Sequence, residues 1–293
     1  MRAISTVVDT TVFLLLLGGA VSTLVVGTGS IGASPSGPDP ADETAELLTT
    51  TTLSVEYDLR PTANHSDGVS YDDTSGQFDR SAHGTTAGLL AAATRSGATL
   101  RDERVTPAGR GFERAVRNET RSVIRQRGGA VAVTARWTPY DDAPIGGRVH
   151  VGPEPPARAD VRAARLTVDS GFEPVRERAL DSARVNGTDG VARVVAWSIV
   201  DGYFPPDETR VALHGDAPVD TLTAHRYRRV ARLSNAHLLD VGNASIESMN
   251  DELTDAMTRQ LARDMRRQFS SPEAAARAVQ TGETRIVVRT WSP

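Results

Sequence analysis

The sequence contains no cysteine and no lysine, and only 5% of its residues are aromatic. Without cysteine the chain has no disulfide, no thiolate nucleophile, no cysteine-ligated zinc and no cysteine for lipid attachment. If the folded body lies outside the cytoplasm, it holds together without covalent cross-links, which a chain of 293 residues permits. Because aromatic residues are scarce, we expect the core to consist mainly of valine, leucine and alanine.

The absence of lysine means that all 33 basic residues are arginines. A high-GC genome explains this bias, and the abundance of aspartate, alanine and valine is typical of a haloarchaeal proteome, although the net charge of −4 is mild. At molar salt the electrostatic screening length is about 3 Å. Long-range attraction to a polyanion is then nearly abolished, so we expect no nucleic-acid partner and interpret arginine-rich helices as local ion pairs.

Signatures of catalysis are also missing. The sequence has no HExxH, GxSxG, P-loop, EF-hand or Ser-x-x-Lys motif, and no two of its six histidines have metal-ligand spacing. The adjacent carboxylates Asp72-Asp73 and Asp141-Asp142 fall in turn-rich stretches, where solvated loop acids are the simplest interpretation. We therefore predict no catalytic residue, no cofactor and no metal ligand, and a protein that is not an enzyme.

A long apolar segment stands near the N-terminus. Ile4–Val26 comprises 23 residues, about 34 Å of helix, which is enough to cross a hydrocarbon layer of about 30 Å. Arg2 precedes this segment, and the first acidic residue after it is Asp39. Because the positive flank of a membrane helix stays inside, we expect a single-pass protein of the cell membrane with a cytoplasmic N-terminus and an extracellular C-terminal domain.

Three fates of the apolar segment remain open. A cleaved secretory signal would use the small residues of Gly27–Ala33 as its cleavage region. An uncleaved anchor fits the length of the segment. A prepilin-type signal is the third fate: cleavage after Ala3 would leave Ile4 as the first residue of a retained helix. Two of the three fates keep the helix, so we expect it to be retained.

The stretch after this segment predicts a linker. Gly27–Gly32 matches G-x-G-x-x-G, but it follows a membrane-length run and precedes three prolines, which is the wrong context for a dinucleotide-binding turn. We therefore divide the chain into an N-terminal transmembrane or prepilin-like helix (1–27), a flexible Gly/Pro/Ser linker (28–45) and one extracytoplasmic domain (46–293).

Residue periodicity predicts the α+β class: an N-terminal transmembrane helix followed by one mixed helix–strand ectodomain. Alternating or β-branched runs predict strands over 49–59, 130–137, 148–151, 164–168 and 284–291. Helical spacing of apolar residues predicts helices over 81–94, 111–127, 173–184, 191–203, 219–233 and 246–269, with a short one after 271.

Two kinds of surface feature are candidates for interaction. The run His225–Arg232 (HRYRRVAR) is the densest basic stretch, and we favour a solvated helix face neutralised by Asp216 and Asp220 over an anion or partner surface. Four N-x-S/T sequons are present, of which Asn64, Asn186 and Asn243 are the candidate glycosylation sites. Asn118 falls within a predicted helix and is a poorer acceptor.

Two stretches carry a resemblance to a known family. The start RAISTVVDTTVFLLLL and the segment AVAVTARWTPYDDAPIGGRVHVGPEPPARADVRAARLTV resemble an uncharacterised haloarchaeal membrane-protein family, a domain of unknown function encoded near type IV pilus or Tad-like assembly genes. The resemblance implies a non-enzymatic accessory or minor pilin-like component of an archaeal pilus-like assembly, with the membrane and assembly proteins as partners. It supplies no catalytic residue. A secreted or anchored extracytoplasmic ligand-binding or hydrolase domain, with an unknown small-molecule ligand, is the alternative.

Overall fold

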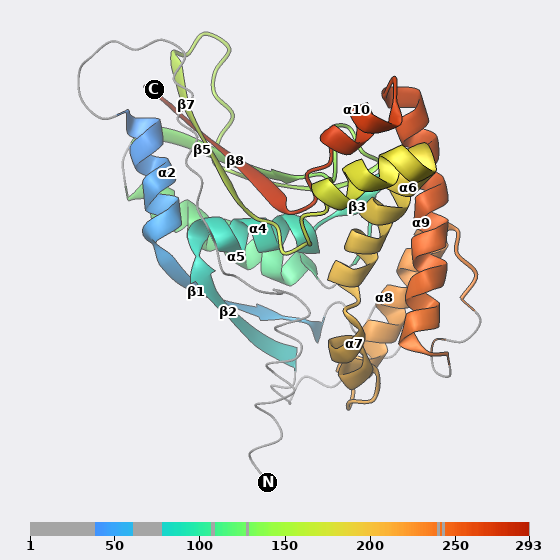
Figure 1. The fold of residues 1–293 in the computed structure, drawn as a ribbon. Helices are drawn as coiled ribbons and strands as arrows, with labels where there is room; N and C mark the ends of the chain where they lie inside the picture. Colours follow the sequence, from blue (N-terminus) through green and yellow to red (C-terminus); the bar gives the residue numbers. More distant parts are fainter. Residues whose placement is uncertain are drawn as a thin grey trace.

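The structure is a computed structural model, and it describes residues 39–60, 78–106, 109–126, 129–238, 241 and 244–292. Over these residues eight helices, a six-stranded antiparallel sheet and a two-stranded hairpin form an α+β fold (Figure 1). The predicted class is therefore confirmed for this part of the chain, whereas the apolar segment 4–26 lies outside it. Of the helices described, none combines the length and the apolar character needed to cross a membrane.

The elements follow one another without long structured gaps. The helices are α2 (Pro40–Thr50), α4 (Thr86–Ser96), α5 (Gly109–Arg125), α6 (Arg176–Tyr203), α7 (Pro206–Leu213), α8 (Val219–Ser234), α9 (Ile246–Gln268) and α10 (Pro272–Arg277). The strands are β1 (Thr52–Asp58), β2 (Asp79–Thr85), β3 (Thr99–Leu100), β4 (Glu103–Arg104), β5 (Ala130–Trp137), β6 (Ile145–Val151), β7 (Val161–Asp169) and β8 (Glu283–Trp291).

The six-stranded sheet has the order β4-β3-β6-β5-β8-β7. Because successive side chains point to opposite faces of a strand, alternate residues form one apolar face. Val133, Val149, Leu166 and Ile286 belong to this face, and they pack against α2, α4 and α5 in one hydrophobic cluster. Figure 1 shows these three helices on the same side of the sheet. We call the opposite side the open face, because no described helix packs on it.

A second hydrophobic cluster joins α6, α8, α9 and α10 to one end of the sheet. Trp137 anchors it: its indole N–H donates to the carbonyl of Thr281 at 2.7 Å, and its ring stacks on Phe172 with centroids 4.4 Å apart. The predicted apolar stripe of the longest amphipathic helix is confirmed, since Met249, Leu253 and their stripe neighbours in α9 are buried in this cluster. The two clusters place a helical subdomain beside a helix-backed sheet.

The boundaries of two predicted segments are wrong. The linker expected over 28–45 ends earlier, because α2 begins at Pro40, where Asp39 accepts a hydrogen bond from the Ala41 N–H at 2.9 Å and proline occupies the first turn. The helix expected from residue 81 begins at Thr86, and residues 79–85 form β2 instead. Pairing with β1 determines this strand, in which Ala82 is the only fully buried side chain.

The two helices expected over 173–184 and 191–203 are joined into α6. Gly187 interrupts the helix with φ 60° and ψ −150°, a conformation that only glycine adopts readily, and the chain resumes its helical course directly afterwards. The sequence analysis also missed α7 and the two-residue strands β3 and β4. Tertiary packing rather than a periodic pattern defines these short elements.

Candidate functional site

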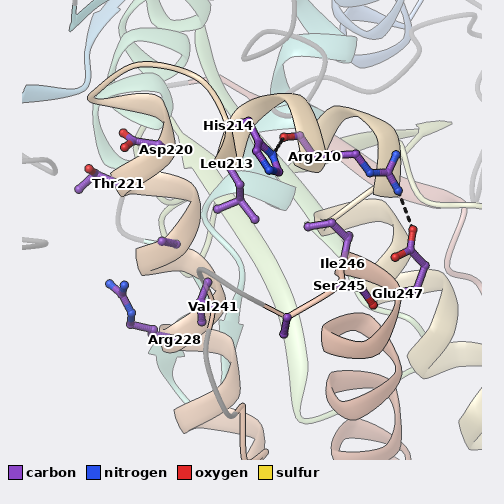
Figure 2. Close-up of a pocket in the computed structure, with 12 residues that line it drawn as sticks. Arg210, Leu213, His214, Asp220, Thr221, Arg228, Val241, Ser245, Ile246 and Glu247 are labelled. Carbon is purple, nitrogen blue, oxygen red and sulfur yellow. Dashed lines mark hydrogen bonds and ion pairs between the residues drawn. The ribbon is translucent and has the colours of Figure 1, made fainter.

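The best-defined hollow with a mixed polar and apolar lining lies between α7, α8 and the start of α9 (Figure 2). It has a volume of about 470 Å³, within the range of small-molecule sites. Leu213, Val241 and Ile246 give it an apolar floor, and charged side chains of α7, α8 and α9 form its rim. We call it the α7–α8–α9 cavity.

One side of the rim is an internal charge network. The Arg210 guanidinium contacts Asp207 at 2.8 Å and Glu247 at 2.6 Å. His214 lies within 2.8 Å of the Arg210 carbonyl through its Nδ1 atom, which acts as the donor when it carries the proton. These side chains are exposed, so each ion pair contributes at most about 1 kcal/mol. Arg210 and Glu247 therefore satisfy each other, and Figure 2 shows their contact across the cavity.

The other side of the rim contains groups without partners. The Oδ1 atom of Asp220, in the first turn of α8, is buried and has no hydrogen-bond partner among the described residues. An unsatisfied buried acceptor costs about 1–3 kcal/mol, although the positive end of the helix dipole lowers this cost. Arg228 also makes no hydrogen bond or ion pair with the described part of the chain. This wall therefore has both an unused acceptor and an unused cation.

Arg228 belongs to the basic run 225–232, which the structure divides by face. Arg226 is buried and points inward: it donates to the Tyr203 carbonyl at 3.2 Å, and its guanidinium lies 5.4 Å from the centre of the Phe204 ring. Burial lowers the pKa of Arg226. Arg229 donates to the Arg104 carbonyl at 2.9 Å and contacts Glu103 at 3.4 Å. The expectation of one solvated face is therefore wrong for Arg226.

Arg228 and Arg232 form the exposed part of the run, four residues apart on α8. Arg232 likewise makes no hydrogen bond or ion pair within the described ranges, so Asp216 and Asp220 do not neutralise this face as expected. Both arginines line a second hollow of about 450 Å³, whose other residues include His237 and Leu238. Two unpaired guanidinium groups beside two partly apolar hollows favour the anion or partner surface that the sequence analysis ranked second.

A buried polar cluster connects this helical subdomain to α4. The Tyr203 hydroxyl donates to the Arg95 carbonyl at 2.9 Å, and the Arg95 guanidinium donates to the Gly171 carbonyl at 3.0 Å. Burial lowers the pKa of Arg95 and raises the pKa of Tyr203. Neither residue carries a motif, and an arginine within a run of alanines is the one sequence signal that marks Arg95. The contacts fit a structural role: they hold α4 against α6.

The predicted modification sites are only partly within the described ranges. Ala3, Ile4, Asn64 and Asn243 lie outside them. Asn186 is exposed on α6, immediately before the interruption at Gly187, rather than in a loop between two helices. The side chain is therefore open to solvent, as an acceptor of a glycan requires, but the structure does not bring it near the α7–α8–α9 cavity or any other candidate site residue.

The histidines and carboxylates that the structure describes do not converge. Across these residues, no group of three or more His, Asp or Glu side chains is arranged to hold a metal ion. His150 contacts Glu154 at 3.6 Å and the Thr134 hydroxyl at 3.0 Å on the open face of the sheet, far along the chain from His214. Asp141 and Asp142 are exposed and contact arginines of that face.

Comparison with known proteins identifies the family but not an activity. Residues 8–291 match the model of a family of unknown function, DUF7284. No curated protein and no solved structure matches the chain. The match starts within the apolar N-terminal segment and ends at the last residue of β8, so it covers both parts of the chain. The chain therefore belongs to DUF7284, a domain family of unknown function.

Proposed function

We propose that this protein is a non-enzymatic, single-pass cell-surface protein, whose α+β domain is held outside the membrane by a retained N-terminal helix. The observation that carries the proposal is the apolar segment Ile4–Val26 directly ahead of a folded domain that begins at Asp39. A segment of this length spans a bilayer, and Arg2 on its short flank favours a cytoplasmic N-terminus. The family match supports reading the segment and the domain as one unit, because it includes both.

Within this role we propose an accessory or minor pilin-like component of an archaeal type IV pilus-like assembly. The Arg2-Ala3-Ile4 start supports this version, since cleavage after Ala3 would expose an apolar helix that packs into a filament base. The unpaired arginines beside the hollows of α8 support an interaction role for the domain, because they offer charge to a partner rather than to the fold.

The alternative is an extracytoplasmic hydrolase or ligand-binding domain. The α7–α8–α9 cavity brings His214, Asp220 and Ser245 to one lining, and these residue types occur in hydrolases. The Ser245 hydroxyl, however, accepts the Ser248 N–H at 3.1 Å as the cap of α9, and the ring of His214 contacts a main-chain carbonyl. These contacts support a cavity for binding more than a nucleophile with its base.

Topology can be tested directly because the chain has no cysteine. We expect a single cysteine at Ser122→Cys, on the exposed side of α5, to react with a membrane-impermeant maleimide on intact cells. A cytoplasmic protein with one exposed cysteine serves as the control and should react only after lysis. Labelling of the Ser122→Cys variant that also required lysis would contradict the proposed orientation.

A further inference from the structure

The open face of the six-stranded sheet is rich in arginine. On β5, β6, β7 and β8 the residues that alternate with the buried apolar ones point away from α2, α4 and α5. Five of these residues are arginines, which we call the arginine face: Arg136, Arg148, Arg165, Arg285 and Arg289. All five are exposed or half-buried.

Strand register places three of these arginines side by side. Arg148 on β6 is directly opposite Arg136 on β5, and Arg136 is directly opposite Arg285 on β8. On the neighbouring strand pair, Arg165 of β7 is opposite Val287, one position away from Arg285 on the same face. Like charges directly opposite each other destabilise a sheet. The stability of the sheet therefore does not explain why these positions are arginines.

The acids around the arginine face are too few to neutralise it. Asp142 contacts Arg136 at 3.7 Å and Asp141 contacts Arg285 at 3.5 Å, and both carboxylates are largely exposed. Glu154 contacts His150 at 3.6 Å. The remaining arginines of the face, Arg148, Arg165 and Arg289, make no hydrogen bond or ion pair with any residue the structure describes. The other acids of these strands, Asp169 and Glu283, are opposite each other at one corner.

The chain enters the domain beside this face. Asp39, which caps α2, lies 3.9 Å from Arg162 on β7, the edge strand of the sheet. Residues 27–38 separate Asp39 from the apolar segment and span at most roughly 45 Å when fully extended. A domain of this size has a diameter of about 45 Å. A retained anchor would therefore keep the domain within about one diameter of the bilayer.

We propose that the arginine face lies against the bilayer and binds anionic lipid headgroups. The inference rests on the proposed membrane anchor, and it adds the surface that the domain presents to the membrane. A broad array of guanidinium groups on a sheet fits a plane of phosphates, and each guanidinium can bind a phosphate through two parallel hydrogen bonds. Tethering makes the contact intramolecular, so weak individual contacts suffice. Each arginine near an anionic surface contributes roughly a fivefold factor to binding.

The test uses the full chain in lipid nanodiscs with a spin-labelled headgroup as a fluorescence quencher. One variant carries a fluorophore at Ala163→Cys, on the open face of β7, and the other at Ser122→Cys on α5, behind the sheet. In phosphatidylcholine discs with 30% phosphatidylglycerol, we expect the label at 163 to be quenched at least threefold more than the label at 122. The ratio should fall toward one in discs of phosphatidylcholine alone.

Matched variants separate the arginine face from overall charge. R148Q/R165Q/R289Q should abolish the difference in quenching, and R148K/R165K/R289K should retain most of it. R114Q/R117Q/R121Q removes the same charge from α5 and should leave the difference intact. Equal quenching of the two labels in anionic discs, or a difference unaffected by R148Q/R165Q/R289Q, would overturn the inference and point to an acidic protein partner. A chain that did not co-elute with discs would instead contradict the anchor, and this inference with it.

Discussion

Tyr140 is the residue whose ionisation is most strongly coupled to folding. Its side chain is fully buried, and its hydroxyl donates to Asp264 Oδ2 at 3.0 Å. Burial, together with the negative charge of Asp264, raises the pKa of Tyr140 above the ordinary value of 10.0. Below pH 10 both the folded and the unfolded chain keep this proton, so the contribution of Tyr140 to stability is complete there.

Above pH 10 we expect the stability of the protein to fall. The unfolded chain releases the tyrosine proton while the folded chain retains it, which costs about 1.4 kcal/mol per pH unit for this group. Urea unfolding of the full chain and of Tyr140→Phe at pH 9 and pH 11 measures the difference. The wild type should lose about 1.4 kcal/mol more than the variant; an equal loss in both would contradict the assignment.

At the scale of elements, the packing of α4 on the sheet depends on Gly147. A Cβ atom at this position of β6 would lie 1.9 Å from the Thr94 carbonyl oxygen, so the helix approaches the strand more closely than any side chain permits. The alanines of α4, including Ala91 and Ala93, are buried at this contact. Small residues on both elements therefore set the distance between helix and sheet.

We expect Gly147→Ala to destabilise the protein by at least about 2 kcal/mol, because the backbone of α4 must move away from the sheet. Gly84→Ala is the matched control, since a Cβ atom there meets only Leu89 at 3.7 Å, an ordinary contact. Denaturant unfolding of both variants gives the comparison. If Gly147→Ala were as stable as Gly84→Ala, the close approach of α4 would be refuted.

Periodic elements were predictable from the sequence, and elements set by tertiary context were not. The strand Ala130–Trp137 and the apolar stripe of α9 have clear periods of two and about 3.6, and both predictions are confirmed. Residues 79–85 are mostly polar, so their pairing with β1 leaves no signal in their own periodicity. The Asn-Gly pair at 186–187 predicts a break, but packing of α6 against α9 and α10 realigns the helix beyond Gly187.

The candidate site was less predictable than the fold for a similar reason. The run 225–232 was recognisable as basic, but its charges divide between an inward face at Arg226 and an outward face at Arg228, which only the orientation of α8 decides. The arginine face was not predictable, because it gathers single arginines from four strands whose order is not the sequence order. Position in the sheet, rather than spacing in the chain, brings them together.

For the whole molecule, the decisive question is whether the N-terminal segment remains on the mature protein. We expect N-terminal sequencing of the protein from its native membrane to begin at Ile4 if the pilin-like version is correct, and at Met1 for a plain anchor. Both outcomes keep the helix. A first residue near Ser34 would show a cleaved signal and contradict the proposed anchoring.

The row formed by Arg148, Arg136 and Arg285 also makes the surrounding medium part of the fold. Counter-ions damp repulsion over a distance of about 10 Å at 0.1 M salt and about 3 Å at 1 M. We therefore expect the thermal midpoint of the wild type to rise between these concentrations by more than that of Arg136→Gln, with Arg117→Gln as the control. Equal increments would show that the repulsion is negligible; a larger one in the wild type would make a saline environment a condition for full rigidity of this sheet.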